Sequence, residues 1–426
     1  MRPIIFRRGC SRYQPDAVRK KINGVARCSC TSTHASPDKA WSAWMSSTVN
    51  DLNDRKLLRS LHTLTPVPGS ANHVLCGATS SCLTVFAAND YLGLSSHPEV
   101  RAAASAAAAE YGSGPRSSAL VCGHTEFHQQ LAAALARLKG TESALLFPTG
   151  FAANLAVLGT LAVGPSCAIF SDELNHASIV DGARLAARGA DATLQIYRHN
   201  DLDHLQTLLA RSAAPRKLII SDSLFSMDGD LADCRGLAAL RDQFGALLCL
   251  DEAHATLVFG EFGGGVAEAQ GVADKVDVHV GTLSKAFGSH GGFVACSKQL
   301  ERLLLSKGRA GIYSTALPVP AVAAAAAALR LATPKLRSSL WESIRYFTSA
   351  IGASGHPSAI VPILMHSEAA ALEASHILRC QGFLVPAIRP PTVPRGTSRL
   401  RVALSAAHEP HELDGLIQVL KPAAMF

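Results

Sequence analysis

Between residues 140 and 296, short apolar β-type segments alternate with stretches whose pattern is helical. Most of these segments are apolar throughout, as expected for strands buried on both faces of a mainly parallel sheet. Helices between such strands form layers against the sheet, so the pattern predicts a three-layer α/β domain. The predicted strands cover residues 143–147, 167–170, 194–197, 217–221, 246–250, 276–280 and 293–295.

The rest of the chain predicts further parts around this sheet. Residues 38–85 are expected to form an N-terminal arm, because apolar residues recur three and four apart over 39–64 and indicate a helix. A large α/β domain is predicted over 86–317, and a smaller α+β domain over 318–426. In the large domain a strand over 86–94 should run into a turn, before helices over 98–111 and 124–138.

The basic residues gather at the N-terminus. Residues 1–37 contain eight Lys or Arg and one acidic residue, so this segment alone accounts for the net charge of +7. The remainder is neutral, which argues against nucleic-acid binding. An Arg-rich leader without an apolar centre resembles a transit peptide for a plastid or mitochondrion, and a disordered tail is the alternative.

Cysteine spacing and hydropathy argue against a zinc-binding protein and against a membrane protein. The eleven cysteines show no C-x-x-C spacing, which indicates reduced thiols and no zinc site. No apolar run is long enough to predict a membrane span.

Lys285 follows the predicted strand 276–280 and lies among small residues. Burial lowers the pKa of a lysine, and the free amine can then condense with an aldehyde. Enzymes that use pyridoxal phosphate (PLP) need such a Schiff-base lysine. A solvated loop lysine has the same local sequence, so the prediction depends on groups upstream.

Those groups follow other predicted strands, whose carboxyl ends bind ligands in open α/β sheets. Asp251 ends strand 246–250, where a carboxylate would keep the PLP ring nitrogen protonated. His254, three residues on, could bind the ring hydroxyl. Gly150 and Phe151 begin a helix after strand 143–147, and N–H groups at a helix start attract phosphate.

Three weaker candidates complete the set. His176 follows strand 167–170 and could stack on the ring, Ser226 follows strand 217–221, and Thr282 could contact the phosphate. The letters D-E-A-H at 251–254 also occur in nucleic-acid helicases. A helicase needs a G-x-x-x-x-G-K-[ST] loop, and the sequence contains no Gly-Lys dipeptide.

The motifs TGFAAN, NHAS, SLFSMDGD, DEAH and TLSKAFG, in this order and spacing, resemble those of the α-oxoamine synthases. These are PLP enzymes of aminotransferase fold type I, and the resemblance runs from about residue 38 to the C-terminus. It implies that Lys285 forms the Schiff base and that Asp251 contacts the pyridinium nitrogen. It also implies that His254 binds the ring oxygen and His176 stacks on the ring.

The resemblance further implies how cofactor and substrate are held. Gly150, Phe151, Ser226 and Thr282 would hold PLP. Arg401 would bind a substrate carboxylate through two oxygens, and Arg59 and Thr392 would touch the substrate. Residues 313–315 would reach in from a second subunit, since such enzymes are homodimers with shared sites.

The segments 387–394 and 398–401 are similar to the family's biotin-pathway members, which implies L-alanine and a pimeloyl thioester as substrates. The segment 114–123 resembles the plant and algal members, whereas bacterial members carry a Gly-rich form there. The thioester is therefore expected to be either a CoA or a carrier-protein derivative. Two alternatives to this function remain open. The chain could be a sister synthase that uses glycine or serine, or it could be an inactive partner subunit. Arg401 in a surface salt bridge is the alternative to a carboxylate clamp.

Overall fold

The computed structural model describes residues 37–55, 57–77, 81–162, 166–189, 192–365 and 367–423. The chain divides into two compact units, Met1–Ser60 and Leu61–Phe426. In the first unit, helix α1 (Pro37–Asp54) ends well before residue 64, so the helix predicted over 39–64 is too long. Leu58 is exposed, so the later apolar residues do not mark a buried helix face. The predicted leader, apart from Pro37, lies outside the described residues.

A seven-stranded sheet forms the centre of the second unit, with the order β4-β10-β9-β8-β7-β5-β6. Strand β10 is antiparallel to both of its neighbours, and the other pairs are parallel. All seven predicted strands are confirmed, with ends shifted by at most two residues. Their bounds are β4 (Ser143–Phe147), β5 (Cys167–Asp172), β6 (Thr193–Tyr197), β7 (Arg216–Asp222), β8 (Leu247–Asp251), β9 (Val278–Thr282) and β10 (Gly292–Cys296).

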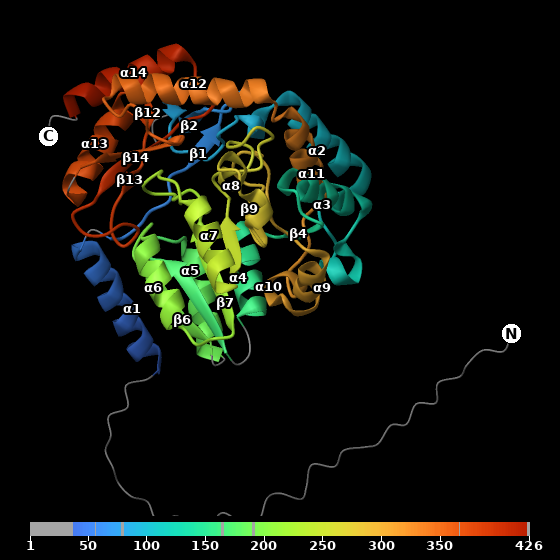
Figure 1. The fold of residues 1–426 in the computed structure, drawn as a ribbon. Coiled ribbons are helices and arrows are strands. Elements are labelled where there is room, and N and C mark those ends of the chain that lie inside the picture. The colour runs from blue at the N-terminus through green and yellow to red at the C-terminus, as the bar shows by residue number, and fades with distance from the viewer. Residues whose placement is uncertain are drawn as a thin grey trace, which may run out of the picture. The chain divides into compact units, whose positions relative to one another are not determined.

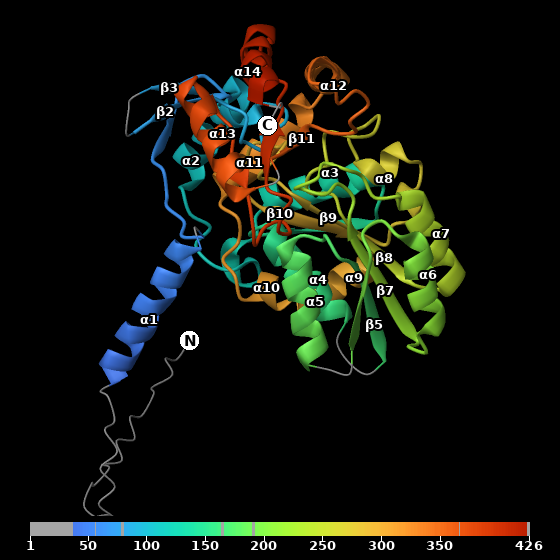
Figure 2. The same ribbon diagram turned by 90° about the vertical axis from the view of Figure 1, so that its left-hand side faces the viewer.

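Helices cover both faces of this sheet (Figures 1 and 2). Successive residues of a strand point to opposite faces, and here both sets are buried: Ile169 and Phe170 belong to two separate apolar clusters. This is the predicted three-layer α/β arrangement. The helices of this part are α2 (Pro98–Tyr111), α3 (Glu126–Lys139), α4 (Gly150–Leu161), α5 (Ala177–Gly189), α6 (Leu202–Arg211), α7 (Cys234–Phe244), α8 (Val266–Ala269), α9 (Lys298–Lys307), α10 (Arg309–Ile312) and α11 (Val319–Leu331).

Two smaller sheets accompany the C-terminal part of the chain. One has the order β11-β14-β13, and the other has the order β1-β2-β3-β12. Strand β3 ends at Val85, so the strand predicted over 86–94 lies earlier, and Phe86 is buried in the core after it. The remaining bounds are β1 (Leu64–Pro66), β2 (His73–Cys76), β3 (Cys82–Val85), β11 (Ile360–Leu364), β12 (Phe383–Leu384), β13 (Ala387–Ile388), β14 (Arg399–Ala403), α12 (Pro334–Ala350), α13 (Glu368–Cys380) and α14 (Pro410–Ala423).

The division into domains at residues 317 and 318 stays a prediction, because residues 61–426 form one compact unit. Among the described helices, none is by itself long and apolar enough to cross a membrane. Only α11 and α12 meet that test as a pair, and they are bent by 79° relative to each other.

Candidate active site

Several of the predicted site residues lie where β8 and β9 end, beside the end of β7. Asp251 is the last residue of β8, and the strand register places it opposite Asp222, the last residue of β7. Lys285 follows the end of β9 at Thr282. The two carboxyl groups and the amine thus come from neighbouring strands at one edge of the sheet, as the parallel arrangement predicts.

Lys285 lies in a sharply bent loop. Gly288 has a φ of +59°, and a β-carbon added there would lie 2.2 Å from the backbone nitrogen of Ser95, so only glycine fits this bend. Burial lowers the pKa of Lys285 to about 8, although Asp251 and Asp222 oppose this shift. A pKa of about 8 leaves part of the amine deprotonated near neutral pH.

Each oxygen of the Asp251 carboxyl group accepts a hydrogen bond. The backbone N–H of Ala253 donates to Oδ1 at 2.9 Å, and the side-chain amide of Asn154 donates to Oδ2 at 2.6 Å. The neighbouring Asp222 accepts the backbone N–H of His176 at 2.6 Å. Burial, and then the proximity of Asp251, raise the pKa of Asp222 well above its usual range. The neutral form of Asp222 is therefore favoured over the charged form.

Two predicted histidines lie at the same place. His176 has Phe151 against it, with ring centroids 6.3 Å apart and ring planes at 80°, and burial lowers its pKa. His254 is buried, and its Nδ1 lies 2.6 Å from the hydroxyl of Tyr91. Burial, together with Lys285 and Arg401, holds the pKa of His254 well below its usual range. Both rings are therefore neutral near pH 7.

Helix α4 begins beside Thr282. Gly150 is its first residue, and the Thr149 side chain caps the helix by accepting the N–H of Ala152 at 3.0 Å. A β-carbon added at Gly150 would lie 3.4 Å from Cβ of Thr282, so the two predicted phosphate contacts lie side by side. The first N–H groups of a helix have no acceptor within the helix, and the helix dipole favours an anion there.

Arg401 lies on β14 and is 5% exposed. Its Nε donates to the backbone oxygen of Ser226 at 2.6 Å, and its Nη2 donates to Oδ1 of Asn89 at 3.2 Å. The alternative of an exposed arginine in a surface salt bridge is therefore wrong. The two contacts fix the guanidinium near Lys285, with which it interacts electrostatically.

Ser226 and Thr392 line a common cavity of about 330 Å³. The wall consists of the loop after β5, the loop after β7 and the segment 391–394. A histidine joins the first two loops: His199 lies 3.0 Å from Asp172 and 2.8 Å from Asp230. Burial alone would lower the pKa of His199, but the hydrogen bonds to these two carboxylates raise it to about 10. Arg59 belongs to the other compact unit, so its substrate contact stays a prediction.

Sequence reasoning missed Asp222, Asn154, Ser178, Tyr91 and Asn89. Asp222 could have been found, because it ends a predicted strand as Asp251 does. Asn154 and Ser178 are the last residues of the motifs TGFAAN and NHAS, so the motifs could have pointed to them. Tyr91 and Asn89 are notable only for their contacts with His254 and Arg401, far along the chain.

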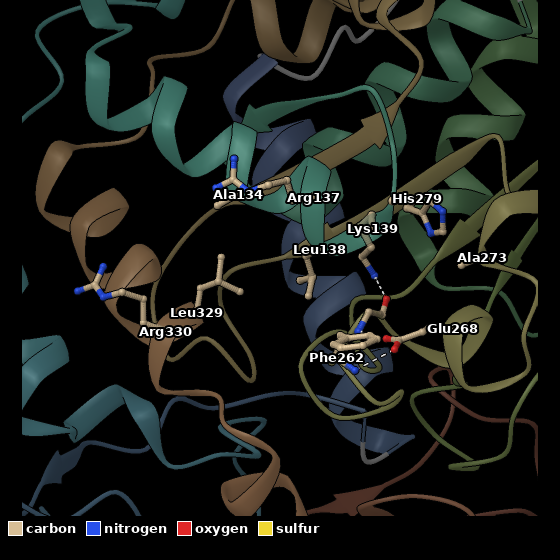
Figure 3. Close-up of a pocket in the computed structure, with 12 residues that line it drawn as sticks. Ala134, Arg137, Leu138, Lys139, Phe262, Glu268, Ala273, His279, Leu329 and Arg330 are labelled. Carbon is tan, nitrogen blue, oxygen red and sulfur yellow. Dashed lines mark hydrogen bonds between the residues drawn. The ribbon is translucent and has the colours of Figure 1, made fainter.

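A larger cavity, of about 650 Å³, lies between α3, α11 and the segment 262–273 (Figure 3). None of the predicted site residues lines it. In its wall, Lys139 donates to the carboxylate of Glu252 at 2.7 Å and to the backbone oxygen of Gly264, and His279 lies 2.8 Å from the same carboxylate. These buried contacts connect α3 to the segment 262–273 and to the residue that follows β8.

The donor set at the end of β7–β9 fits PLP. Asp251 can hold a protonated ring nitrogen, Lys285 offers a free amine, and the start of α4 with Thr282 suits a phosphate. The flat ring of His176 is available for stacking.

Comparisons with known proteins agree with this chemistry. The family pattern described as aminotransferase class I and II matches residues 82–420. The chain is 47% identical over 361 residues to the 8-amino-7-oxononanoate synthase of Arabidopsis thaliana, which covers 81% of this chain and 75% of that protein.

Two solved structures are also similar. The serine palmitoyltransferase of S. paucimobilis, solved with a bound PLP–myriocin aldimine, has a TM-score of 0.83 at 28% identity and covers 91% of this chain and 98% of its own. The 8-amino-7-oxononanoate synthase of Francisella tularensis has a TM-score of 0.68 at 27% identity, with coverage of 80% and 97%.

Proposed function

The chain belongs to the aminotransferase class I and II family, and we propose that it has 8-amino-7-oxononanoate synthase activity. In this reaction L-alanine condenses with a pimeloyl thioester, and the thiol and CO2 are lost. The observation that carries the proposal is the 47% identity to a protein of that name over most of both chains. The TM-score favours serine palmitoyltransferase instead. We give the identity more weight, because one fold serves many activities.

Bound PLP supplies an electron sink that stabilises negative charge at the Cα of the substrate. Lys285 binds the cofactor, and its amine removes the Cα proton of alanine, because a pKa of about 8 leaves part of the amine free near neutral pH. Asp251 keeps the ring nitrogen protonated. The carbon–carbon bond to the acyl group then forms as the carbon–sulfur bond breaks, and loss of the carboxylate as CO2 completes the reaction.

The other residues hold the reactants in place. Gly150, Phe151 and Thr282 bind the phosphate, Ser226 holds the cofactor through its hydroxyl, and His254 binds the ring oxygen. His176 stacks on the ring, where its neutral imidazole adds no positive charge. Arg401 binds the alanine carboxylate through two oxygens, and Thr392 and Arg59 contact the substrate. The fixed position of Arg401 on β14 supports its role.

We propose a homodimer in which residues 313–315 complete the partner's site. Tyr313 is 73% exposed, and Val121 is 75% exposed. A bridge between Ser118 and Thr315 brings their two segments together. Exposed apolar side chains gathered at one place are typical of protein interfaces. For residues 1–37 we propose import into a plastid or mitochondrion, which rests on their charge alone.

The test is a substrate panel. The purified protein with PLP is incubated with alanine, glycine or serine and with pimeloyl-, acetyl-, succinyl- or palmitoyl-CoA, and the products are identified by mass spectrometry. We expect turnover with alanine and the pimeloyl thioester. Faster turnover of serine with palmitoyl-CoA, or of glycine with a short acyl-CoA, would assign a sister activity. Pimeloyl-carrier protein is added as a separate donor, and Lys285→Ala is the control without the amine.

A further inference from the structure

Asn154 connects two parts of the site through one amide group. Its Nδ2 donates to Oδ2 of Asp251 at 2.6 Å and to Oγ of Ser178 at 2.9 Å. A carboxylate accepts hydrogen bonds, so the NH2 group must face Asp251, and both of its hydrogens are then used. The carbonyl oxygen of Asn154 is buried and has no partner among the described residues. An asparagine retained only for packing would gain from an apolar side chain of similar size, because an unpaired buried oxygen is unfavourable.

The hydrogen bonds fix where the protons lie. Ser178 Oγ accepts from Asn154, so its own hydrogen is available to Nδ1 of His176, which lies 2.7 Å away. The backbone N–H of Ser178 also donates to this Nδ1, at 3.3 Å. Two donors that converge on one ring nitrogen require that nitrogen to be unprotonated. The proton of His176 therefore lies on Nε2, and the ring is neutral.

Charged groups surround this histidine on several sides. Asp251 and Asp181 favour its protonation, whereas burial and Lys285 oppose it. Asp222 accepts a hydrogen bond from the backbone N–H of His176, and this bond does not involve the imidazole ring. Ser178, which Asn154 holds in place, donates two hydrogen bonds to Nδ1 of His176, one from its hydroxyl and one from its backbone N–H. Only a ring with an unprotonated Nδ1 can accept them.

We propose that Asn154 and Ser178 are positioning residues that hold Asp251 as an oriented carboxylate and His176 as the neutral Nε2–H form. This deepens the proposed function, on which its catalytic part rests. A neutral ring over the protonated pyridine of PLP avoids placing two positive charges face to face.

The first measurement is the nitrogen chemical shifts of ¹⁵N-labelled histidine, recorded with and without PLP, with His176 assigned through His176→Gln. The unmodified protein should show a protonated Nε2 and a bare Nδ1 at pH 7. Ser178→Ala removes the hydroxyl donor and keeps the backbone N–H, so it should increase the share of the Nδ1–H form and raise the pKa of His176 by about one unit. Ser178→Thr keeps the hydroxyl and should restore the original pattern.

The second measurement is the pH dependence of kcat and of the visible absorption of bound PLP. Asn154→Leu should lower kcat about ten- to a hundredfold, as expected for loss of a hydrogen bond to a charged group, with little change in the KM for alanine. It should also shift the pH at which the visible band titrates. Thr160→Val is the matched control, because Thr160 lies on the same helix and its buried hydroxyl has no partner within the described chain.

Unchanged histidine shifts in Ser178→Ala, or unchanged pH profiles in Asn154→Leu, would overturn the proposal. The same holds if Thr160→Val produces shifts of equal size, because the effect would then come from the fold of α4. The shifts of the cofactor-free protein test the proton arrangement even if the substrate panel fails, so the two proposals can fail separately.

Discussion

Replacing Arg401 with lysine tests the proposed carboxylate clamp. The substitution keeps the charge on β14 but removes the planar guanidinium, whose paired N–H groups match the two oxygens of a carboxylate. In the structure Arg401 already donates to Ser226 and Asn89, so its remaining donors have a fixed direction. Lysine cannot make those two contacts and also reach the substrate through two points.

The expected magnitude follows from the lost contact. A hydrogen bond to a charged group is worth about 1.5–3 kcal/mol, and each 1.4 kcal/mol corresponds to about a tenfold change in affinity. We therefore expect the KM for L-alanine to rise about ten- to 150-fold in Arg401→Lys. The KM for the pimeloyl thioester should change little, since Arg401 is proposed to contact only the amino acid.

Steady-state kinetics with each substrate varied in turn measures both constants. Arg399→Lys is the matched control, because Arg399 is buried on the same strand but pairs with Asp228 at 2.5 Å. It should lower thermal stability without a selective effect on alanine. If the two KM values of Arg401→Lys rise together, or if neither changes, Arg401 supports the fold and does not bind the substrate.

Four further predictions address other parts of the molecule. Lys285→Ala should abolish turnover and the visible absorption of the lysine-bound cofactor while the circular dichroism of the fold is kept; an active variant with an unchanged spectrum would refute the assignment. Asp251→Asn should still bind PLP but lose about four orders of magnitude in kcat, if several kcal/mol of charge stabilisation are lost; near-normal turnover would mean that another group holds the ring proton. The pKa of His199, raised to about 10, makes its contribution to stability complete below about pH 6.5 and lost as the pH rises through about 10. The melting temperature should therefore fall less steeply between pH 7 and 10 in His199→Gln, and parallel curves would exclude this role. A fluorescent protein fused behind residues 1–37 should enter plastids or mitochondria, and diffuse cytosolic fluorescence would contradict the transit-peptide prediction.

The central strands were predictable because they are buried along most of their length. A strand covered on both faces has no polar positions to interrupt it, so β5, β7 and β8 read as continuous apolar runs. The first polar residue after each run then marks the edge of the sheet, which identified Asp251. The helix predicted over 39–64 was too long because leucines on an exposed stretch have the same spacing as leucines on a buried helix face.

What the sequence could not supply is the distribution of charge within the site. Asp222 and Asp251 both end strands, and nothing in either motif shows that the pKa of Asp222 is raised. The register of β7 and β8 places them opposite each other, where two like charges repel. Asp251 receives N–H donors on both oxygens, one of them from Asn154, which lies 97 residues away in the sequence. Burial beside this carboxylate raises the pKa of Asp222. The orientation of Asp251 therefore depends in part on Asn154 of α4, and this contact exists only once the chain has folded.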